Sequence, residues 1–194
     1  ITLGLDEGEG ISFVLTTPNS RTITIEYYNG PVWLGATSSS AKELSNWKGI
    51  SNLDDLNGKN IYVYTTASNP IDFNFDSLIT VGSVTSKKDV TVSKPLTTTG
   101  ALKVVAGTLT ISQDANLTVA GNIEVSGNVD NSATITTTNS GNITFQSDYE
   151  GHNGVNWTSP INCAGNINIS GVSNFRGDIT ANSLDVVRRI AEAS

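Results

Sequence analysis

The stretch that decides the fold is residues 116–129, NLTVAGNIEVSGNV, and shorter versions recur as GNITF from Gly141 and GNINIS from Gly165. Each version places two apolar residues two positions apart, so both side chains lie on the same face of a strand. A small polar corner then leads to the next strand. Because each unit buries its apolar face only against the units before and after it, the repeat predicts a coiled stack of strands.

The same pairing of apolar positions extends through most of the chain. The pairs are Tyr62 and Tyr64, Phe73 and Phe75, Val90 and Val92, Leu102 and Val104, Leu109 and Ile111, Leu117 and Val119, Ile123 and Val125, Ile143 and Phe145, and Ile167 and Ile169. About six to eight residues separate successive pairs in the most regular part, which is too few for a helical crossover. Antiparallel hairpins would favour Asn-Gly or Asp-Gly turns, whereas Gly-Asn before a strand is the commoner order here. These features predict an all-β fold, a parallel β-solenoid of about six turns, with three strands and roughly 18 to 22 residues in each turn.

Three regions follow from this pattern. Residues 1–49 are expected to form a small N-terminal β-rich module for attachment or capping, with a hairpin formed by alternating residues from Ile11 and from Ile23. Ser40 and Glu43 have the spacing of a capping box, which predicts one short helix that ends near residues 47–49.

The solenoid is expected over residues 50–182, and residues 183–194 are expected to form a C-terminal cap. Leu184, Val187 and Ile190 have helical spacing, so this cap is expected to be helical or to contact another chain. An open strand edge favours a partner, and a homo-oligomer, preferably a trimer, would bury these three residues between chains.

Composition excludes several classes of partner. The 194 residues carry a net charge of −7, and Lys and Arg form no stripe that could neutralise phosphates, so no nucleic-acid partner is expected. No apolar run approaches the roughly 20 residues that span a bilayer, so no membrane partner is expected either. Asn, Ser, Thr and Gly are abundant, which favours strands and turns over helices.

One segment interrupts the repeat. Residues 146–160 have no recognisable strand pair and are expected to form an extended loop from one corner of the solenoid. Loops on a rigid scaffold often carry function, so any binding site is expected here. The favoured explanation of the segment is nevertheless an extended corner whose Trp157 and Tyr149 pack back on the solenoid. The candidate binding residues are Asp148, Tyr149, Glu150, His152, Asn153 and Trp157.

The chemical alternatives are weaker. Cys163 could pair with His152 as a nucleophile, but a buried inward cysteine is ordinary at that position. Asp148, Glu150 and Asp178 could supply two carboxylates for glycan hydrolysis, yet no local motif selects them. Asp54 and Asp55, and the acidic residues near Asp6, lack the spaced ligand ladder of calcium loops. We therefore expect no catalytic residues, no metal and no cofactor.

The phrases GTLTIS, NLTVAGNIEVSGNV, GNITF and GNINIS resemble the β-solenoid shafts of phage fibres and tailspikes and of bacterial surface adhesins. Their short rungs are also similar to bactofilin filaments. The segments near residues 53–58 and 75–82 resemble solenoid turns of the leucine-rich type. The resemblance covers about two thirds of the chain and implies a shaft.

Three functions from different classes fit this sequence. The first is a non-enzymatic structural protein of a virion, a head fibre, spike or decoration protein. Residues 1–49 would contact the capsid or another virion protein, and the solenoid would attach to a host surface or glycan. The second is an extracellular or cell-surface adhesin or filament subunit, and the third is a bactofilin-like scaffold polymer. The expected location is the virion surface or, for the second function, the cell surface.

Overall fold

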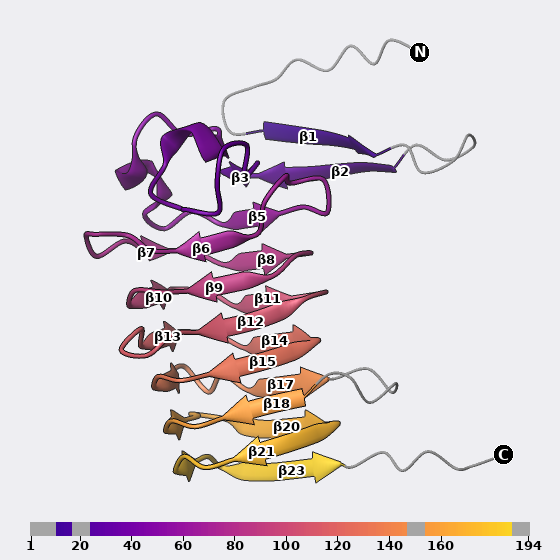
Figure 1. The fold of residues 1–194 in the computed structure, drawn as a ribbon, viewed down its shortest axis with the longest axis vertical. Helices are drawn as coiled ribbons and strands as arrows, with labels where there is room; N and C mark the ends of the chain where they lie inside the picture. The colour runs from indigo at the N-terminus through magenta and orange to yellow at the C-terminus, as the bar shows by residue number, and fades with distance from the viewer. Residues whose placement is uncertain (1–10, 17–23, 147–153, 188–194) are drawn as a thin grey trace, which may run out of the picture.

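The structure, a computed structural model, describes residues 11–16, 24–146 and 154–187. It is an all-β chain in which three parallel sheets coil around one apolar core (Figure 1). Successive strands pass from the first sheet to the second, then to the third, and then back to the first one level further along the coil axis. The predicted parallel β-solenoid is therefore confirmed.

The three sheets are named sheet I, sheet II and sheet III here. Sheet I contains β4 (Trp47–Lys48), β3 (Val32–Trp33), β5 (Ile61–Val63), β8 (Val84–Ser86), β11 (Leu102–Val104), β14 (Ile123–Ser126), β17 (Ile143–Gln146), β20 (Asn166–Ser170) and β23 (Ser183–Val187). Sheet II contains β6 (Ile71–Phe73), β9 (Val90–Val92), β12 (Thr108–Ile111), β15 (Asn128–Asn131), β18 (Gly154–Trp157) and β21 (Val172–Phe175). Sheet III contains β7 (Thr80–Val81), β10 (Leu96–Thr98), β13 (Leu117–Val119), β16 (Ile135–Thr137), β19 (Ile161–Asn162) and β22 (Ile179–Thr180).

The coil makes six complete turns, from β5 to β22, and begins a seventh with β23. The number of residues between paired positions of sheet I is, in chain order, 23, 18, 21, 20, 24 and 17. The range of turn lengths, 17 to 24 residues, is wider than the predicted 18 to 22, because the corners differ in length while the strands keep their register. The number of turns agrees with the prediction.

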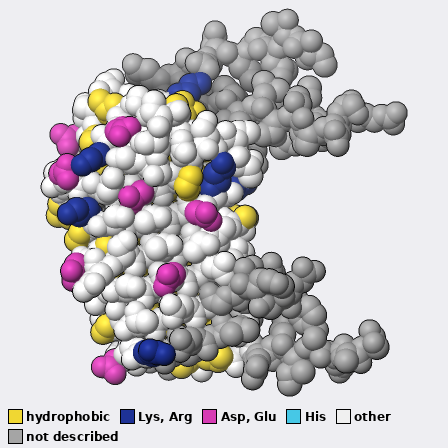
Figure 2. Space-filling view, in the orientation of Figure 1, with side chains coloured by type: hydrophobic (Ala, Val, Ile, Leu, Met, Phe, Trp, Pro, Cys, Tyr) yellow, Lys and Arg dark blue, Asp and Glu magenta, His cyan; other side chains and the backbone are white. Residues whose placement is uncertain are grey.

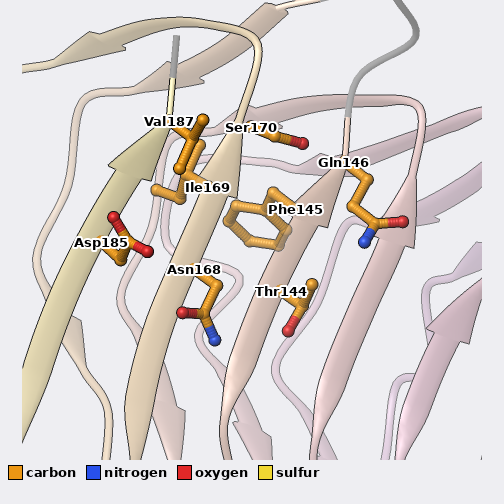
Figure 3. Close-up of a pocket in the computed structure, with 8 residues that line it drawn as sticks. All are labelled: Thr144, Phe145, Gln146, Asn168, Ile169, Ser170, Asp185 and Val187. Carbon is orange, nitrogen blue, oxygen red and sulfur yellow. The ribbon is translucent and has the colours of Figure 1, made fainter. Parts of the chain in front are cut away.

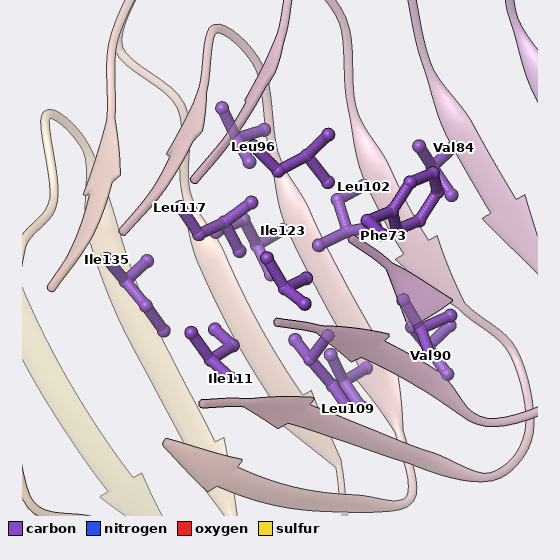
Figure 4. Close-up of a cluster of buried hydrophobic side chains, with 14 of the residues drawn as sticks. Phe73, Val84, Val90, Leu96, Leu102, Leu109, Ile111, Leu117, Ile123 and Ile135 are labelled. Atoms are coloured by element: carbon purple, nitrogen blue, oxygen red, sulfur yellow. The ribbon is translucent and has the colours of Figure 1, made fainter. Parts of the chain in front are cut away.

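The core consists of apolar columns that run along the coil axis. In sheet I, Leu102 lies between Val84 and Ile123, and Ile123 in turn lies under Ile143. All four side chains are 0% exposed, and similar columns from sheets II and III meet them (Figure 4). Since every level repeats the same contacts, stability depends mainly on contacts between neighbouring turns.

The inward phase of one predicted strand is wrong by one residue. The sequence pattern pairs Tyr62 with Tyr64, but the inward residues of β5 are Ile61 and Val63, which align with Val84 and Ser86 of β8. Residues 61–64 are all apolar or aromatic, so the sequence alone does not define which face of the strand is buried. In the structure Tyr62 is the half-buried, outward residue. The neighbouring turn decides it, because only one register places aliphatic side chains in the column.

Some inward positions hold polar side chains at the ends of strands. Thr98 donates from Oγ1 to the carbonyl of Gly100 at 2.7 Å, and Thr137 donates in the same way to Gly141 at 2.8 Å. Both residues are at most 3% exposed. These hydroxyls satisfy corner carbonyls that the strand ladders leave unpaired, so their burial costs little.

The Gly-Asn phrases form ladders of their own at one corner. Asn122 Oδ1 accepts the backbone N–H of Asn142 at 2.9 Å, and Asn142 Oδ1 accepts that of Asn166 at 2.8 Å. The glycine before Asn142 is needed because two backbones approach closely there. Gly141 does not have a left-handed backbone conformation, but a Cβ atom there would meet the backbone of Gly121 in the preceding turn. Close approach of two backbones, and not a positive φ, therefore requires glycine at this corner.

Replacing Asn142 with Ala is expected to lower the free energy of unfolding by about 1 kcal/mol, because the N–H of Asn166 loses its acceptor. Urea unfolding followed by circular dichroism measures the change. Asn168→Ala is the control, since the structure assigns that side chain no hydrogen bond within the described residues. Equal stability of the two variants would show that the asparagine ladder contributes nothing.

The N-terminal end of the coil is closed. β1 (Ile11–Thr16) and β2 (Thr24–Asn29) pair antiparallel, which confirms the predicted hairpin. β3 continues sheet I in parallel with β5, and β4 then pairs antiparallel with β3 at the edge of the sheet. Trp33 and Trp47 meet edge to face with ring centroids 5.0 Å apart, and both are buried. The first apolar level of the core is thus covered by the chain itself.

The predicted helix after Ser40 is wrong. The structure has only a three-residue 3-10 turn there, Leu44–Asn46. Glu43 does not complete a capping box, because its carboxylate accepts hydrogen bonds from the hydroxyls of Thr37 and Ser38. Asn46 is 0% exposed and bonds to the N–H groups of Thr37 and Ser38 and to the carbonyl of Ser40. These contacts hold the segment as a compact loop, and a helix over the same residues could not make them.

A true capping box occurs one segment later, at the 3-10 turn Leu53–Leu56. Asp55 Oδ2 accepts the N–H of Ser51 at 2.7 Å and that of Asn52 at 3.0 Å, and Asn52 Oδ1 accepts the N–H of Asp55. The two backbone hydrogen bonds, that from Ser51 first, lower the pKa of the Asp55 carboxyl below its ordinary 3.8. Asp55 therefore has a local structural role here.

The depressed pKa of Asp55 predicts a pH dependence. Its contribution to stability is fully present above the ordinary pKa of 3.8 and is lost as the pH falls through the lowered pKa of the folded state. Between about pH 5 and pH 2, the urea midpoint of the wild type is expected to fall more than that of Asp55→Asn. Asp54→Asn, which removes the neighbouring carboxylate but not these amide contacts, should follow the wild type. Parallel curves for the wild type and Asp55→Asn would contradict the prediction.

The C-terminal cap is not helical where the structure describes it. Residues 183–187 form β23, which pairs in parallel with β20. Leu184 lies over Ile167 and Val186 over Ile169, so the alternation of the solenoid continues and overrides the helical spacing of Leu184 and Val187. Residues 188–194, including Ile190, lie outside the described residues.

Candidate binding surface

The expected loop is shorter than the sequence suggests. Within residues 146–160, Gly154–Trp157 form β18, which pairs with β15. The pattern of aliphatic pairs does not predict this strand, because its inward residues are Val155 and Trp157. Of the candidate binding residues, Asp148, Tyr149, Glu150, His152 and Asn153 lie outside the described residues.

Trp157 belongs to the core. It is 1% exposed, and its ring packs on Phe145 with centroids 5.5 Å apart. It aligns with Asn131 of β15, whose own side chain is 0% exposed. The large ring fills the space beside that shorter residue. A side chain in this position cannot contact a surface ligand, so the assignment of Trp157 to a binding surface is corrected.

The outer face of sheet I is the part of the described surface that remains closest to the expected site. Thr144, Asn168 and Asp185 are in register on β17, β20 and β23 and form one outward column. Figure 2 shows that charged side chains are scattered over the visible face of the molecule and that uncharged atoms dominate it. The sequence contains no Lys or Arg between Lys103 and Arg176. This part of the coil therefore favours an uncharged ligand over an anionic one.

A shallow pocket lies on this face at the ends of the strands. It is lined by Thr144, Phe145, Gln146, Asn168, Ile169, Ser170, Asp185 and Val187 (Figure 3). Gln146, Ser170 and Val187 form a second column beside the first one. The volume is about 90 Å³, which is small beside the roughly 300–1,000 Å³ of pockets that enclose a drug-sized ligand. The pocket could therefore hold one edge of a larger ligand.

The side chains around this pocket offer amide, hydroxyl and carboxylate groups. The amides of Gln146 and Asn168 can donate and accept hydrogen bonds, and the Asp185 carboxylate can accept them. Val187 is 49% exposed and adds an apolar surface. This mixture suits a ligand that has both hydroxyl groups and an apolar ring face. The pocket cannot be predicted from the sequence pattern, because it depends on register between strands that are 17 to 24 residues apart.

The structure places Cys163 apart from this pocket. Cys163 is 5% exposed, and its thiol is 3.3 Å from the carbonyl of Gly141 at a corner of the core. His152 lies outside the described residues, so the proposed pair is not tested. Among residues 11–16, 24–146 and 154–187, no group of three or more His, Cys, Asp or Glu side chains could hold a metal ion. The described chain also has no helix long and apolar enough to cross a bilayer.

Comparison with known proteins finds no matching family model, no matching curated protein and no matching solved structure. The likeness to fibre and adhesin shafts thus rests on the repeated strand phrases and on the fold. A β-solenoid of this kind is compatible with a structural fibre or an adhesin.

Proposed function

We propose that this chain is a non-enzymatic structural protein of a virion surface, a head fibre, spike or decoration protein that presents a stiff solenoid. One observation carries the proposal: a single apolar core runs without interruption through six turns, from β5 to β22. Such a rod is suited to hold and display its outer faces. Residues 1–49 would attach it to a capsid or other virion protein.

The ligand that we propose for the rod is a neutral surface glycan, bound at the pocket of sheet I. The absence of Lys and Arg from 104 to 175 argues against an anionic ligand, and the amide and hydroxyl groups of the pocket suit a neutral one. A shallow pocket binds one sugar weakly, but many copies on one particle would bind a glycan surface tightly through avidity. An adhesin on a cell surface would use the same shaft, and it is the alternative.

The scaffold polymer is the least favoured alternative. A filament that grows end to end needs an open edge at both ends of each subunit. At the N-terminal end, β4 pairs antiparallel with β3, and Trp33 and Trp47 are buried beneath the chain. Within the described residues β4 offers only two residues to a further strand, which supports a discrete spike or adhesin over a filament.

Mass spectrometry of purified particles and of washed cell envelopes tests the location. The proposal expects the chain among the particle proteins. Enrichment in the envelopes would favour the adhesin, and turnover of a glycan substrate by the purified protein would overturn the non-enzymatic role.

Glycan-array binding tests the pocket. The double variant Gln146→Ala and Asn168→Ala is expected to reduce binding to neutral glycans at least about tenfold, which corresponds to one or two lost hydrogen bonds. Thr118→Ala, an outward change on sheet III, is the matched control and should bind like the wild type. Equal binding by the double variant would rule out this pocket as the glycan site.

A further inference from the structure

Among the strands that the structure describes, the last one at the C-terminal end of the coil has an unpaired edge. β23 is the last strand of sheet I, and within the described residues it pairs with β20 alone. Leu184 and Val186 point into the core columns but remain 48% and 45% exposed. The residues beneath them, Ile167 and Ile169, are 0% and 2% exposed. The two inward apolar side chains of the last strand are therefore about half exposed.

The two ends of the rod are not equivalent. The N-terminal end is closed by β3 and β4, as described above. Within the described residues, the outer strand at that end is β4, which offers only two residues to a further strand, whereas β23 offers five. Contact between two C-terminal ends therefore uses more backbone groups than head-to-tail stacking would. Contact between two identical ends has two-fold symmetry and closes after two copies.

We propose that a second copy of this chain covers the open end, with β23 of one copy paired antiparallel to β23 of the other. The strand has five residues, and Asp185 is its midpoint. Pairing centred on Asp185 uses all five and places Leu184 opposite Val186 of the partner subunit. The inward columns of both copies then continue into each other, and sheet I becomes one sheet across the dimer.

The same register brings the two Asp185 carboxylates face to face on the outer surface. Like charges directly opposite one another weaken a strand pair. The dimer is therefore expected to be moderate in affinity and to become a few-fold tighter in Asp185→Asn. This inference does not depend on the proposed function, and it differs from the trimer expected from the sequence.

Residues 188–194 are the other possible cover. If they close the end, the protein is a monomer. Sedimentation equilibrium over a wide concentration range separates monomer, dimer and trimer, and the dimer is the expected result.

Cross-linking of the whole 194-residue chain tests the register. In Asp185→Cys the two thiols would lie on directly opposed residues, with Cβ atoms about 5 Å apart. In Asn168→Cys, one strand further back in the same column, they would be three strand spacings apart, about 14 Å. A bis-maleimide reagent shorter than that distance should link the first variant and not the second. Native Cys163 is buried, so it can stay.

A disrupting variant completes the test. Val186→Lys would bury an unpaired charge in the contact and should weaken dimerisation at least about tenfold. Its circular dichroism and urea midpoint establish that it remains folded. If it does not fold, the cross-linking pair decides the matter. A monomer or trimer at every concentration, or equal cross-linking of the two cysteine variants, would overturn the proposal.

Discussion

Gly141→Ala is expected to lower the free energy of unfolding by about 3 kcal/mol and the melting temperature by roughly 6–12 °C. A Cβ at this position would clash with the carbonyl oxygen of Gly121 and would lie only 2.7 Å from its carbonyl carbon. Both atoms are backbone atoms of the preceding turn, so no side chain can rotate away. The two turns would have to separate at this corner, which would weaken the asparagine ladder as well.

Gly58→Asn is the control for this change. Gly58 has nothing within 4 Å of its Cβ position, and its φ of 69° is one that asparagine tolerates. The control should lose less than about 1 kcal/mol. Thermal and urea unfolding measure both variants. If Gly141→Ala were as stable as Gly58→Asn, close approach of the turns could not be the reason for the Gly-Asn phrase.

Trp157→Ala is expected to lose about 3–5 kcal/mol of stability, because the cavity would lie in the middle of the core beside Phe145. The neighbouring turns cannot collapse into the space without leaving their register. Trp157→Phe keeps a ring in the column and should lose considerably less. Urea unfolding by circular dichroism gives the comparison.

Asn156→Ala is the matched control on the same strand. Asn156 points outward, and its side chain donates to Asp130 at 3.2 Å on an exposed surface, so its loss should stay within about 0.5 kcal/mol. A near-neutral Trp157→Ala that instead abolished binding to glycans would contradict the placement of Trp157 in the core. It would restore the surface role expected from the sequence.

The sequence is sufficient for the class of fold because strand alternation and corner chemistry agree over many turns. Leu117 with Val119 and Ile123 with Val125 are each predicted to point inward, and both pairs are buried. The number of turns follows from the same pattern. The first predicted helix is wrong, and a strand replaces the second over the described residues 183–187, because at both ends of the coil the local pattern competes with tertiary contacts. Asn46 in one case and the column under Leu184 in the other decide the structure.

The candidate site is less predictable, for a physical reason. The loop is expected from the absence of a strand pair, and this criterion does not detect β18 or the buried ring of Trp157. The pocket of sheet I is formed by residues such as Thr144 and Asp185 that are far apart in sequence. Only the register of three turns brings them together, and the lengths of the corners between them cannot be derived from periodicity.

Unequal turn lengths have a mechanical consequence. The hydrogen bonds between turns run along the rod, so a pull on its two ends loads them one level at a time. At about 3.4 Å per extended residue, the freed segments of 17 to 24 residues would lengthen the tether in steps of roughly 60–80 Å. A force-extension trace would therefore reproduce the order of long and short turns along the chain.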